Sequence, residues 1–262
     1  MTADTEDLLG YPVCSLPTDL LLDRLEDSLE SDGPCRCLTC INPHSYVVAL
    51  RDPEFRDALH AADWLIPDGV GIVLASRVQS GTVRHRITGW DIFFGLHERL
   101  SRAGRGRVFF LGASEETLAQ IRVNIARDFP GITVAGSLSP PYSTSFTAAE
   151  TTAMIDAINA SGADILWVAM TAPKQEKWIY AHAGRLDVRL AFAVGAVFDF
   201  YVDNVPRSSL VFQRLGMEWL PRLAREPRRL WRRTFISAPV FLWHVVRYCV
   251  IGGAARRERI DR

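Results

Sequence analysis

Short apolar runs alternate with longer amphipathic stretches along most of the chain. The apolar runs are typical of buried β-strands and lie at residues 36–41, 108–111, 133–137, 165–170 and 189–194. The stretches between them predict helices at 19–29, 42–61, 92–103, 115–128 and 148–159, and a further helix that begins at Pro173. Pro53 can divide the second helix. Repeated βα units predict an α/β fold with a Rossmann-like parallel sheet and helices on both of its faces.

The two ends of the chain depart from this alternation. Residues 1–17 are polar, contain Gly10 and Pro12, and predict a loosely held lead-in. From residue 210 onward a basic, aromatic stretch precedes the mostly apolar segment 235–251, which predicts a helical appendage. The pattern therefore divides the chain into an α/β domain at 1–209 and a C-terminal appendage at 210–262.

The apolar segment of the appendage allows three arrangements. A membrane-spanning helix is disfavoured, because burying Arg247 would cost roughly 3 kcal/mol and Pro239 interrupts the run. A helix that lies on an anionic membrane surface, with arginines against lipid phosphates, fits better. Ser237, His244 and Arg247 would then share one face of it. The remaining alternative is a helix that packs on the domain or on a partner subunit.

Ligands of parallel sheets bind at the carboxyl ends of the strands, and polar residues follow several of the predicted strands. The loop 112–114, Leu-Gly-Ala-Ser with its preceding leucine, can cradle a phosphate or a nucleoside, although it is a weak motif. We expect one edge of the sheet to bring together Asn42, Gly112, Ser114, Lys174, Gln175 and Asp199.

Two segments carry more specific signals. Lys174 and Lys177 are the only lysines of the chain, and they lie in the first turn after Pro173. That turn is either an ordinary solvated helix start or a phosphate-binding helix N-terminus. Asp68 lies between Pro67 and Gly69 on a tight turn, which either presents a carboxylate to a cleft or bonds its own backbone.

Composition narrows the class of protein. The 262 residues are 48% hydrophobic and 23% charged, as in a globular protein. A formal net charge of +0 argues against a protein that coats nucleic acid, although the arginine cluster at 222–233 leaves a nucleic-acid-associated interpretation open. No G-x-G-x-x-G motif and no P-loop occurs, which disfavours a dinucleotide oxidoreductase and an NTPase.

The five cysteines are an odd set in a chain without an apolar signal segment at its start, which predicts free thiols in a reducing cytoplasm. Cys35, Cys37 and Cys40 have the spacing of metal ligands, with His44 the nearest fourth candidate. Alternating strand geometry points Cys37 and Cys40 to opposite faces, which favours small core thiols over a metal site.

Five blocks of sequence, in a fixed order, resemble the WecG/TagA/CpsF family of bacterial glycosyltransferases. The blocks are Pro67–Gly71, Arg86–Asp91, Ala172–Trp178, Val194–Asp199 and Met217–Arg229, and the resemblance covers about residues 36–235. It implies an inverting enzyme that moves a hexose or N-acetylhexosamine, of the glucose or N-acetylmannosamine type, from a UDP-sugar to a sugar on a polyprenyl diphosphate. Such an enzyme works in cell-envelope or extracellular polysaccharide synthesis, at the cytoplasmic face of the cell membrane, and can form homo-oligomers.

The resemblance also implies roles for residues. The general base of the family corresponds to Asp68. Substrate-binding residues correspond to Asn42, Arg86, Asp91, Gln175, Asp199 and Arg207, and diphosphate-binding arginines of the appendage correspond to Arg222, Arg229 and Arg232. Because the chain has no Asp-x-Asp triplet, arginines would replace a metal ion, and no metal cofactor is expected.

The sequence departs from the family at Cys40, where threonine is usual, and at Asp203 and Ser208-Ser209 around Arg207. These departures keep an alternative open, in which the chain is a non-catalytic module that binds a nucleotide or a lipid carrier.

Overall fold

A computed structural model describes residues 4–202 and 231–260, with the backbone alone described at 232–234 and 251–260. The strands are β1 Thr5–Leu8, β2 Tyr11–Cys14, β3 Arg36–Ile41, β4 Trp64–Pro67, β5 Arg107–Gly112, β6 Thr133–Leu138, β7 Ile165–Ala169 and β8 Leu190–Ala193. The helices are α1 Thr18–Glu30, α2 Pro43–Ala49, α3 Pro53–Ala61, α4 Val70–Val78, α5 Gly89–Arg102, α6 Glu115–Asp128, α7 Ala148–Ser161, α8 Lys174–His182, α9 Val197–Tyr201 and α13 Ala238–Ile260. A 3₁₀ turn, η1 Ala183–Arg185, follows α8, and a π-helical segment, η2 Arg232–Ser237, leads into α13.

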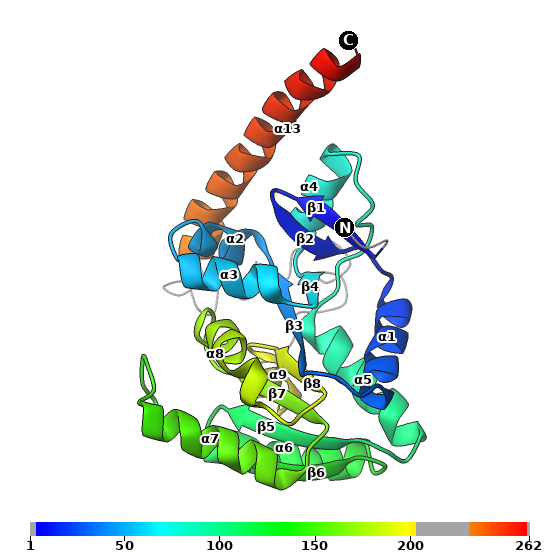
Figure 1. Cartoon of the computed structure of the whole chain (residues 1–262), viewed down its shortest axis with the longest axis vertical. Coiled ribbons are helices and arrows are strands. Elements are labelled where there is room, and N and C mark those ends of the chain that lie inside the picture. The colour runs from blue at the N-terminus through cyan, green and yellow to red at the C-terminus, as the bar shows by residue number, and fades with distance from the viewer. Residues whose placement is uncertain (1–3, 203–230, 261–262) are drawn as a thin grey trace.

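The strands form one sheet in the order β1-β2-β4-β3-β8-β7-β5-β6. Every neighbouring pair is parallel except β1 and β2, which form an antiparallel hairpin at one edge (Figure 1). The predicted parallel α/β sheet is therefore confirmed. Pro53 also begins a new helix, as predicted, and splits the segment after β3 into α2 and α3.

The N-terminal hairpin corrects one expectation. In place of the loosely held lead-in predicted for residues 1–17, residues 5–14 belong to the sheet, where Val13 pairs with Leu65 of β4. Leu8, Tyr11 and Val13 are buried in the core. Strands of four residues carry too little apolar alternation to stand out in a polar sequence, so tertiary pairing decides their structure.

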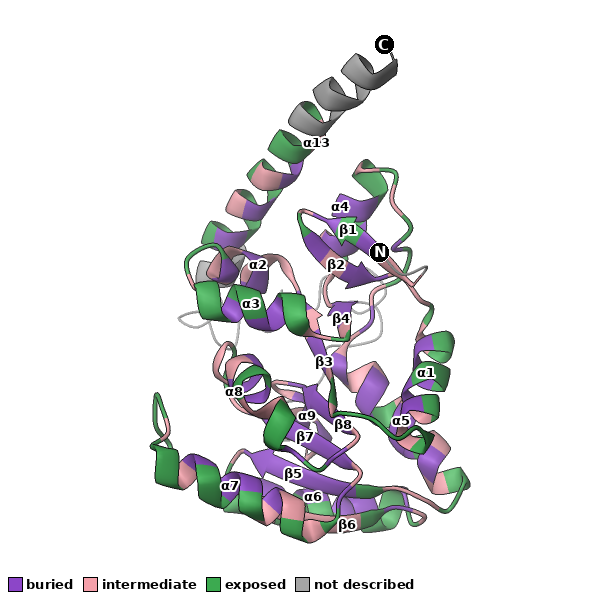
Figure 2. Cartoon of the chain, in the orientation of Figure 1, coloured by how far each residue is buried: buried purple, intermediate pink, exposed green. Residues whose placement is uncertain are grey.

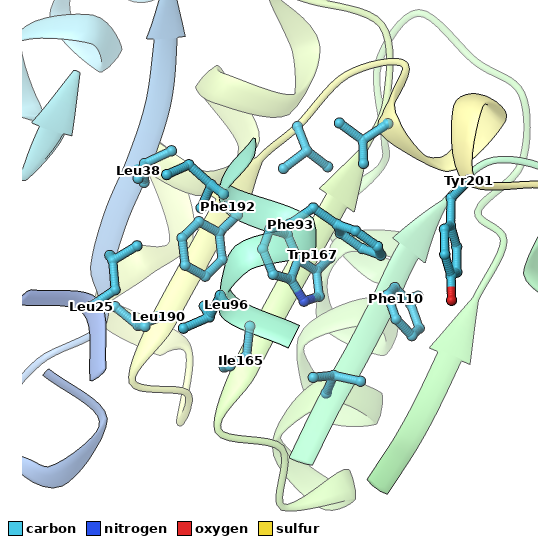
Figure 3. Close-up of a cluster of buried hydrophobic side chains, with 14 of the residues drawn as sticks. Leu25, Leu38, Phe93, Leu96, Phe110, Ile165, Trp167, Leu190, Phe192 and Tyr201 are labelled. Atoms are coloured by element: carbon cyan, nitrogen blue, oxygen red, sulfur yellow. The ribbon is translucent and has the colours of Figure 1, made fainter. Parts of the chain in front are cut away.

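Helices cover both faces of the sheet, and β7 shows why the strands are so apolar. All five of its residues are buried. Trp167 packs on one face, where its ring lies 4.2 Å from that of Phe192 and 4.9 Å from that of Phe93 of α5 (Figure 3). Leu166 and Val168 pack on the other face, in the cluster that includes Ile155 of α7. A strand covered on both sides reads as continuously hydrophobic.

The helix α13 packs on the domain through one side and leaves the other side exposed. Ser237 Oγ lies 2.9 Å from His44 Nδ1, and Tyr46 Oη lies 3.2 Å from His244 Nδ1. Phe241 and Val245 are buried in the same core cluster as Tyr46. Of the three residues predicted to share one face, Ser237 and His244 contact α2, whereas Arg247 is exposed and lies over the Trp243 ring.

Figure 2 shows α13 extending beyond the body of the domain. Its outward side carries exposed apolar residues, among them Leu242, Trp243, Val246 and Val250. Searching the described helices for a segment long and apolar enough to span a membrane finds none.

Candidate functional site

The turn that carries Asp68 lies beside the end of β3. Asp68 donates its backbone N–H to the carbonyl of Ile41 at 2.8 Å, and Gly69 follows with φ of +105°, a conformation that favours glycine. A Cβ on Gly69 would lie 3.8 Å from Cβ of Asn42. The predicted tight turn is therefore present, and it brings Asp68 and Asn42 to adjacent strand ends.

Asn42 also begins α2. Its side-chain oxygen accepts hydrogen bonds from the N–H groups of His44 and Ser45, each at 3.0 Å, and Ser45 Oγ accepts from the Asn42 N–H at 2.7 Å. This reciprocal cap fixes the side chain at the edge of the sheet. The cap uses the side-chain oxygen of Asn42 and does not involve its amide nitrogen.

The Cys40 thiol is influenced by several acidic residues of this edge. Burial raises its pKa well above the usual value, and the nearby carboxylates of Asp68, Glu176 and Asp91 raise it further. Asp68 follows β4, Glu176 lies in α8 after β7, and Asp91 lies in the first turn of α5. The position where the sequence departs from the resembled family thus adjoins the candidate site, and its thiol is uncharged at neutral pH.

Asp91 is held by a capping box at the start of α5. Its carboxylate accepts from the N–H of Thr88 at 2.9 Å and from its hydroxyl at 2.7 Å. Arg86 lies just before this cap, next to Ile87, whose N–H bonds the carbonyl of Pro67 at 3.0 Å. The structure thus brings the Arg86–Asp91 block against the Asp68 turn, with the side chain of Arg86 partly exposed.

Gln175 joins the ends of β7 and β8. Its side-chain oxygen accepts from the N–H of Met170 at 3.1 Å and from that of Gly195 at 3.2 Å. Its amide nitrogen donates to Glu176 Oε1 at 2.9 Å. Asp199, partly exposed in α9, follows the same end of β8. Gln175 therefore shapes this edge from a buried position, 3% exposed, and does not lie open on a surface.

Sequence reasoning missed Glu176. It is 7% exposed, and burial raises the pKa of its carboxyl to about 7 against the opposing effect of the Gln175 hydrogen bond. A signal was present in the sequence, because Trp178 and Ile179 lie one turn further along α8 on the same side as Gln175 and Glu176. The alternative of an ordinary solvated first turn is wrong for these two residues.

The two lysines make structural contacts. Lys174 donates to the carbonyl of Ser143 at 2.5 Å and lies 3.5 Å from the centre of the Phe146 ring, so it ties the loop before α7 to α8. Lys177 pairs with Asp52 at 2.7 Å and with Glu54 at 3.1 Å. These pairs join α8 to α3.

Gly112 and Ser114 lie at the end of β5, the next strand beyond β7. A Cβ at Gly112 would lie 2.2 Å from the carbonyl oxygen of Ala169, so the close approach of β5 and β7 requires glycine there. Ser114 caps α6 and accepts from the N–H of Thr117 at 3.2 Å. Both residues are placed at the predicted edge, with roles in the local backbone.

The appendage arginines are described only in part. Arg207, Arg222 and Arg229 lie outside the described residues, as does the predicted domain boundary at 209–210, and Arg232 is described by its backbone in η2. Among the side chains that are described, no group of three His, Cys, Asp or Glu residues could hold a metal ion. Cys37 and Cys40 pack into clusters on opposite faces of the sheet, as predicted, and all five cysteines are free thiols.

The chain is similar to a group of known proteins. A family model described as "Glycosyl transferase WecG/TagA/CpsF family" matches residues 6–254. An N-acetylglucosaminyldiphosphoundecaprenol N-acetyl-beta-D-mannosaminyltransferase of Bacillus spizizenii is 33% identical over 227 residues, which are 87% of this chain and 85% of that protein. A protein of the same name from Bacillus subtilis is 27% identical over 243 residues, 93% of this chain and 91% of its own length.

Proposed function

The chain belongs to the WecG/TagA/CpsF family of glycosyltransferases, and we propose that it transfers an N-acetylhexosamine of the manno type from a UDP-sugar to N-acetylglucosaminyl diphosphate on a polyprenol. One observation carries the proposal: Asp68 and Asn42 lie on adjacent turns at the carboxyl edge of the sheet, where the Asp68 N–H bonds the carbonyl of Ile41 and a Cβ on Gly69 would lie 3.8 Å from Cβ of Asn42. Both residues lie within the family match. The acceptor and the sugar follow the names of the two Bacillus relatives.

Asp68 acts as the general base in this proposal. It removes the proton of an acceptor hydroxyl, the hydroxyl oxygen attacks the anomeric carbon, and the bond from that carbon to the UDP oxygen breaks on the opposite face. The product is inverted, and the proton stays on the carboxylate until solvent takes it. A base must lie within hydrogen-bond reach of the hydroxyl, and a carboxylate on a short turn braced against Ile41 can hold such a position.

The departing UDP develops negative charge. Arg86 lies at the same edge as Asp68, and Arg207, Arg222, Arg229 and Arg232 follow in the sequence. Planar guanidinium groups bind diphosphate through paired N–H donors. We therefore propose that arginines do the work of a metal ion, and that activity is unchanged after dialysis against EDTA and in its continued presence. Loss of activity under EDTA, restored by Mg²⁺ or Mn²⁺, would contradict this part.

The exposed apolar side of α13 supports a peripheral position on a membrane. A polyprenyl acceptor stays in the bilayer, so the enzyme must come to the surface. Leu242, Trp243 and Val246 are each more than half exposed, at 62%, 55% and 54%. We propose that this side meets the anionic cytoplasmic face of the cell membrane.

Transfer is tested with the full chain, UDP-N-acetylmannosamine and a short-chain polyprenyl diphosphate N-acetylglucosamine, with other UDP-sugars as comparison donors. The expected product is a lipid-linked disaccharide with inverted anomeric configuration, identified by NMR. Asp68→Asn should reduce kcat by roughly 10²–10⁴-fold and leave the thermal unfolding profile intact. Asp57→Asn, a matched change on the exposed side of α3, should leave kcat unchanged.

The alternative is a binding module without turnover. The departure at Cys40 motivates it, because an uncharged thiol lies where the family carries threonine. Tight UDP binding without transfer from any of these donors would establish the alternative. Full activity in Asp68→Asn would instead remove the base from the proposed mechanism and leave the transferase assignment in place.

A further inference from the structure

A cavity of about 150 Å³ lies beneath α3 and α8, on the sheet face that they cover. Small apolar residues such as Ala58 and Ala193 form much of its wall, and Cys37 and Asp63 lie toward the amino end of β3. Thr39 and Glu176 also line the cavity. The cavity therefore extends from Cys37, near the amino end of β3, to Glu176, which adjoins Gln175.

Two buried polar atoms on this wall lack partners. Thr39 Oγ1 and Glu176 Oε2 make no hydrogen bond within the part of the chain that the structure describes, and both side chains are more than nine-tenths buried, at 4% and 7% exposed. Unpaired buried polar atoms are costly, and a cavity of this size can hold water that bonds both of them. The second carboxylate oxygen of Glu176 therefore lies at the cavity wall without a protein partner among the described residues, while the first is bonded to Gln175.

The first oxygen of Glu176 fixes the orientation of Gln175. The amide nitrogen of Gln175 donates to Glu176 Oε1, so its oxygen must turn toward Met170 and Gly195. Those two N–H groups lie where β7 and β8 end. Without an acceptor at position 176 the amide nitrogen would be buried and unpaired, and the reversed orientation would place an NH₂ group against two N–H donors.

We propose that Glu176 is a positioning residue, which locks Gln175 and through it the ends of β7 and β8 that form the wall of the transfer site, and which exchanges protons with solvent through water in the cavity. The inference rests on the proposed function only in calling the ends of β7 and β8 a wall of the transfer site. The lock itself is a property of the fold and can be measured without substrate.

The charge of Glu176 adds a second consequence. Cys37 of β3, Asp63 before β4 and Tyr180 of α8 line the cavity with Glu176, and the Cys40 thiol is close enough for the Glu176 carboxylate to raise its pKa. No arginine, lysine or histidine of the described residues lines the cavity. Ionisation near pH 7 therefore adds negative charge beside a site that is to bind diphosphates, and affinity for such substrates should fall as pH rises.

The lock is tested by amide hydrogen exchange on the full chain, followed at Met170 and Gly195. Glu176→Ala should speed exchange at these two amides by about tenfold or more, whereas Glu176→Gln, which keeps an acceptor for Gln175, should leave it within about threefold. Lys177→Met breaks the adjacent ion pairs to α3 and serves as the matched control, with unchanged exchange at both amides. Unchanged exchange in Glu176→Ala overturns the lock.

The charge is tested by steady-state kinetics between pH 6 and pH 8. In the unaltered protein KM for the UDP-sugar should rise severalfold over this range, while Glu176→Gln should remove the rise. Equal pH profiles for the two proteins overturn the electrostatic part. If Glu176→Ala does not fold, the exchange pattern of Glu176→Thr replaces it, and accelerated exchange at both amides is again required. Absence of transfer in every protein would refute the proposed function and leave the exchange result to decide the lock.

Discussion

Glu6 Oε2 accepts a hydrogen bond from the Ser76 hydroxyl at 2.9 Å, across 70 positions of sequence. The same oxygen accepts from the backbone N–H groups of Thr82 and Val83, the latter at 2.8 Å. A residue of the first strand thus holds the loop that runs from α4 to Arg86. The hairpin is therefore connected to the candidate site through one buried carboxylate.

Replacing Glu6 should loosen that loop. In Glu6→Gln the charge is lost and a buried NH₂ group stands where Oε1 now lies without a partner among the described residues, so we expect the free energy of unfolding to fall by about 1–3 kcal/mol. Urea denaturation measures the change. Glu98→Gln is the matched control, because Glu98 forms an exposed pair with Arg102 and its loss should cost under about 0.5 kcal/mol. Equal effects would show that Glu6 does not brace the loop.

These contacts show which parts of the molecule a sequence can predict. The strands β5, β7 and β8 can be predicted because they are almost wholly buried and therefore apolar, and the turn at Asp68 because proline and glycine flank it. The hairpin with Glu6 gives no such pattern, since its burial depends on pairing with a strand fifty residues away, Val13 with Leu65.

The site shows the same division. The edge that holds Asn42, Asp68 and Gln175 follows from topology, because parallel strands end on one side. What each polar atom binds does not follow from topology. The resemblance implies that Gln175 binds substrate, but its bonds to Met170, Gly195 and Glu176 depend on how closely two strand ends approach, which no motif shows.

A second prediction concerns that close approach at Gly112. The residue has φ of +110°, and an added Cβ would lie 2.2 Å from the Ala169 oxygen. Gly112→Ala must therefore move backbone as well as adopt a strained conformation, and we expect a loss of about 3 kcal/mol or more in the free energy of unfolding. Gly104→Ala shares the positive φ, +64°, but meets nothing within 4 Å, and should cost about 1–2 kcal/mol. Similar losses for both would mean that β5 and β7 separate easily.

A third prediction uses the pH dependence of stability. The carboxyl of Glu176 has a folded pKa of about 7 against a reference value of 4.5, so the folded state holds an extra proton between these values. Stability from this group is lost as pH rises from about 4.5 to 7, at up to about 1.4 kcal/mol per pH unit. The free energy of unfolding of Glu176→Gln should therefore increase relative to that of the unaltered protein as pH rises through this window, and the difference should stay constant above it. A pH-independent difference would show that Glu176 is ionised throughout.

His97 has the opposite effect over nearly the same window. It is 1% exposed and stacked on Trp167, and burial lowers its pKa from 6.5 to about 4. The unfolded state therefore binds a proton first, and stability is lost as pH falls from about 6.5 to 4. His97→Leu should lose less stability than the unaltered protein on acidification. The effects of Glu176 and His97 on stability oppose each other where their windows overlap, between about pH 4.5 and 6.5, so the variants are needed to separate them. Parallel acid profiles for His97→Leu and the unaltered protein would contradict a buried neutral imidazole.

The exposed side of α13 gives the last prediction. Leu242 and Val246 lie one turn apart and point away from the contacts that Phe241 and Val245 make with the domain. Changing both to Gln should leave the free energy of unfolding within about 0.5 kcal/mol, because neither side chain is buried. Each apolar side chain contributes about 1–2 kcal/mol when it enters a bilayer interface, so binding to vesicles of phosphatidylglycerol and phosphatidylethanolamine should fall by about thirtyfold or more. Val123→Gln on α6, at a residue exposed to 61%, is the matched control and should bind as before. Unchanged vesicle binding in the double variant would exclude this side of α13 as the membrane contact and favour a partner subunit as its cover.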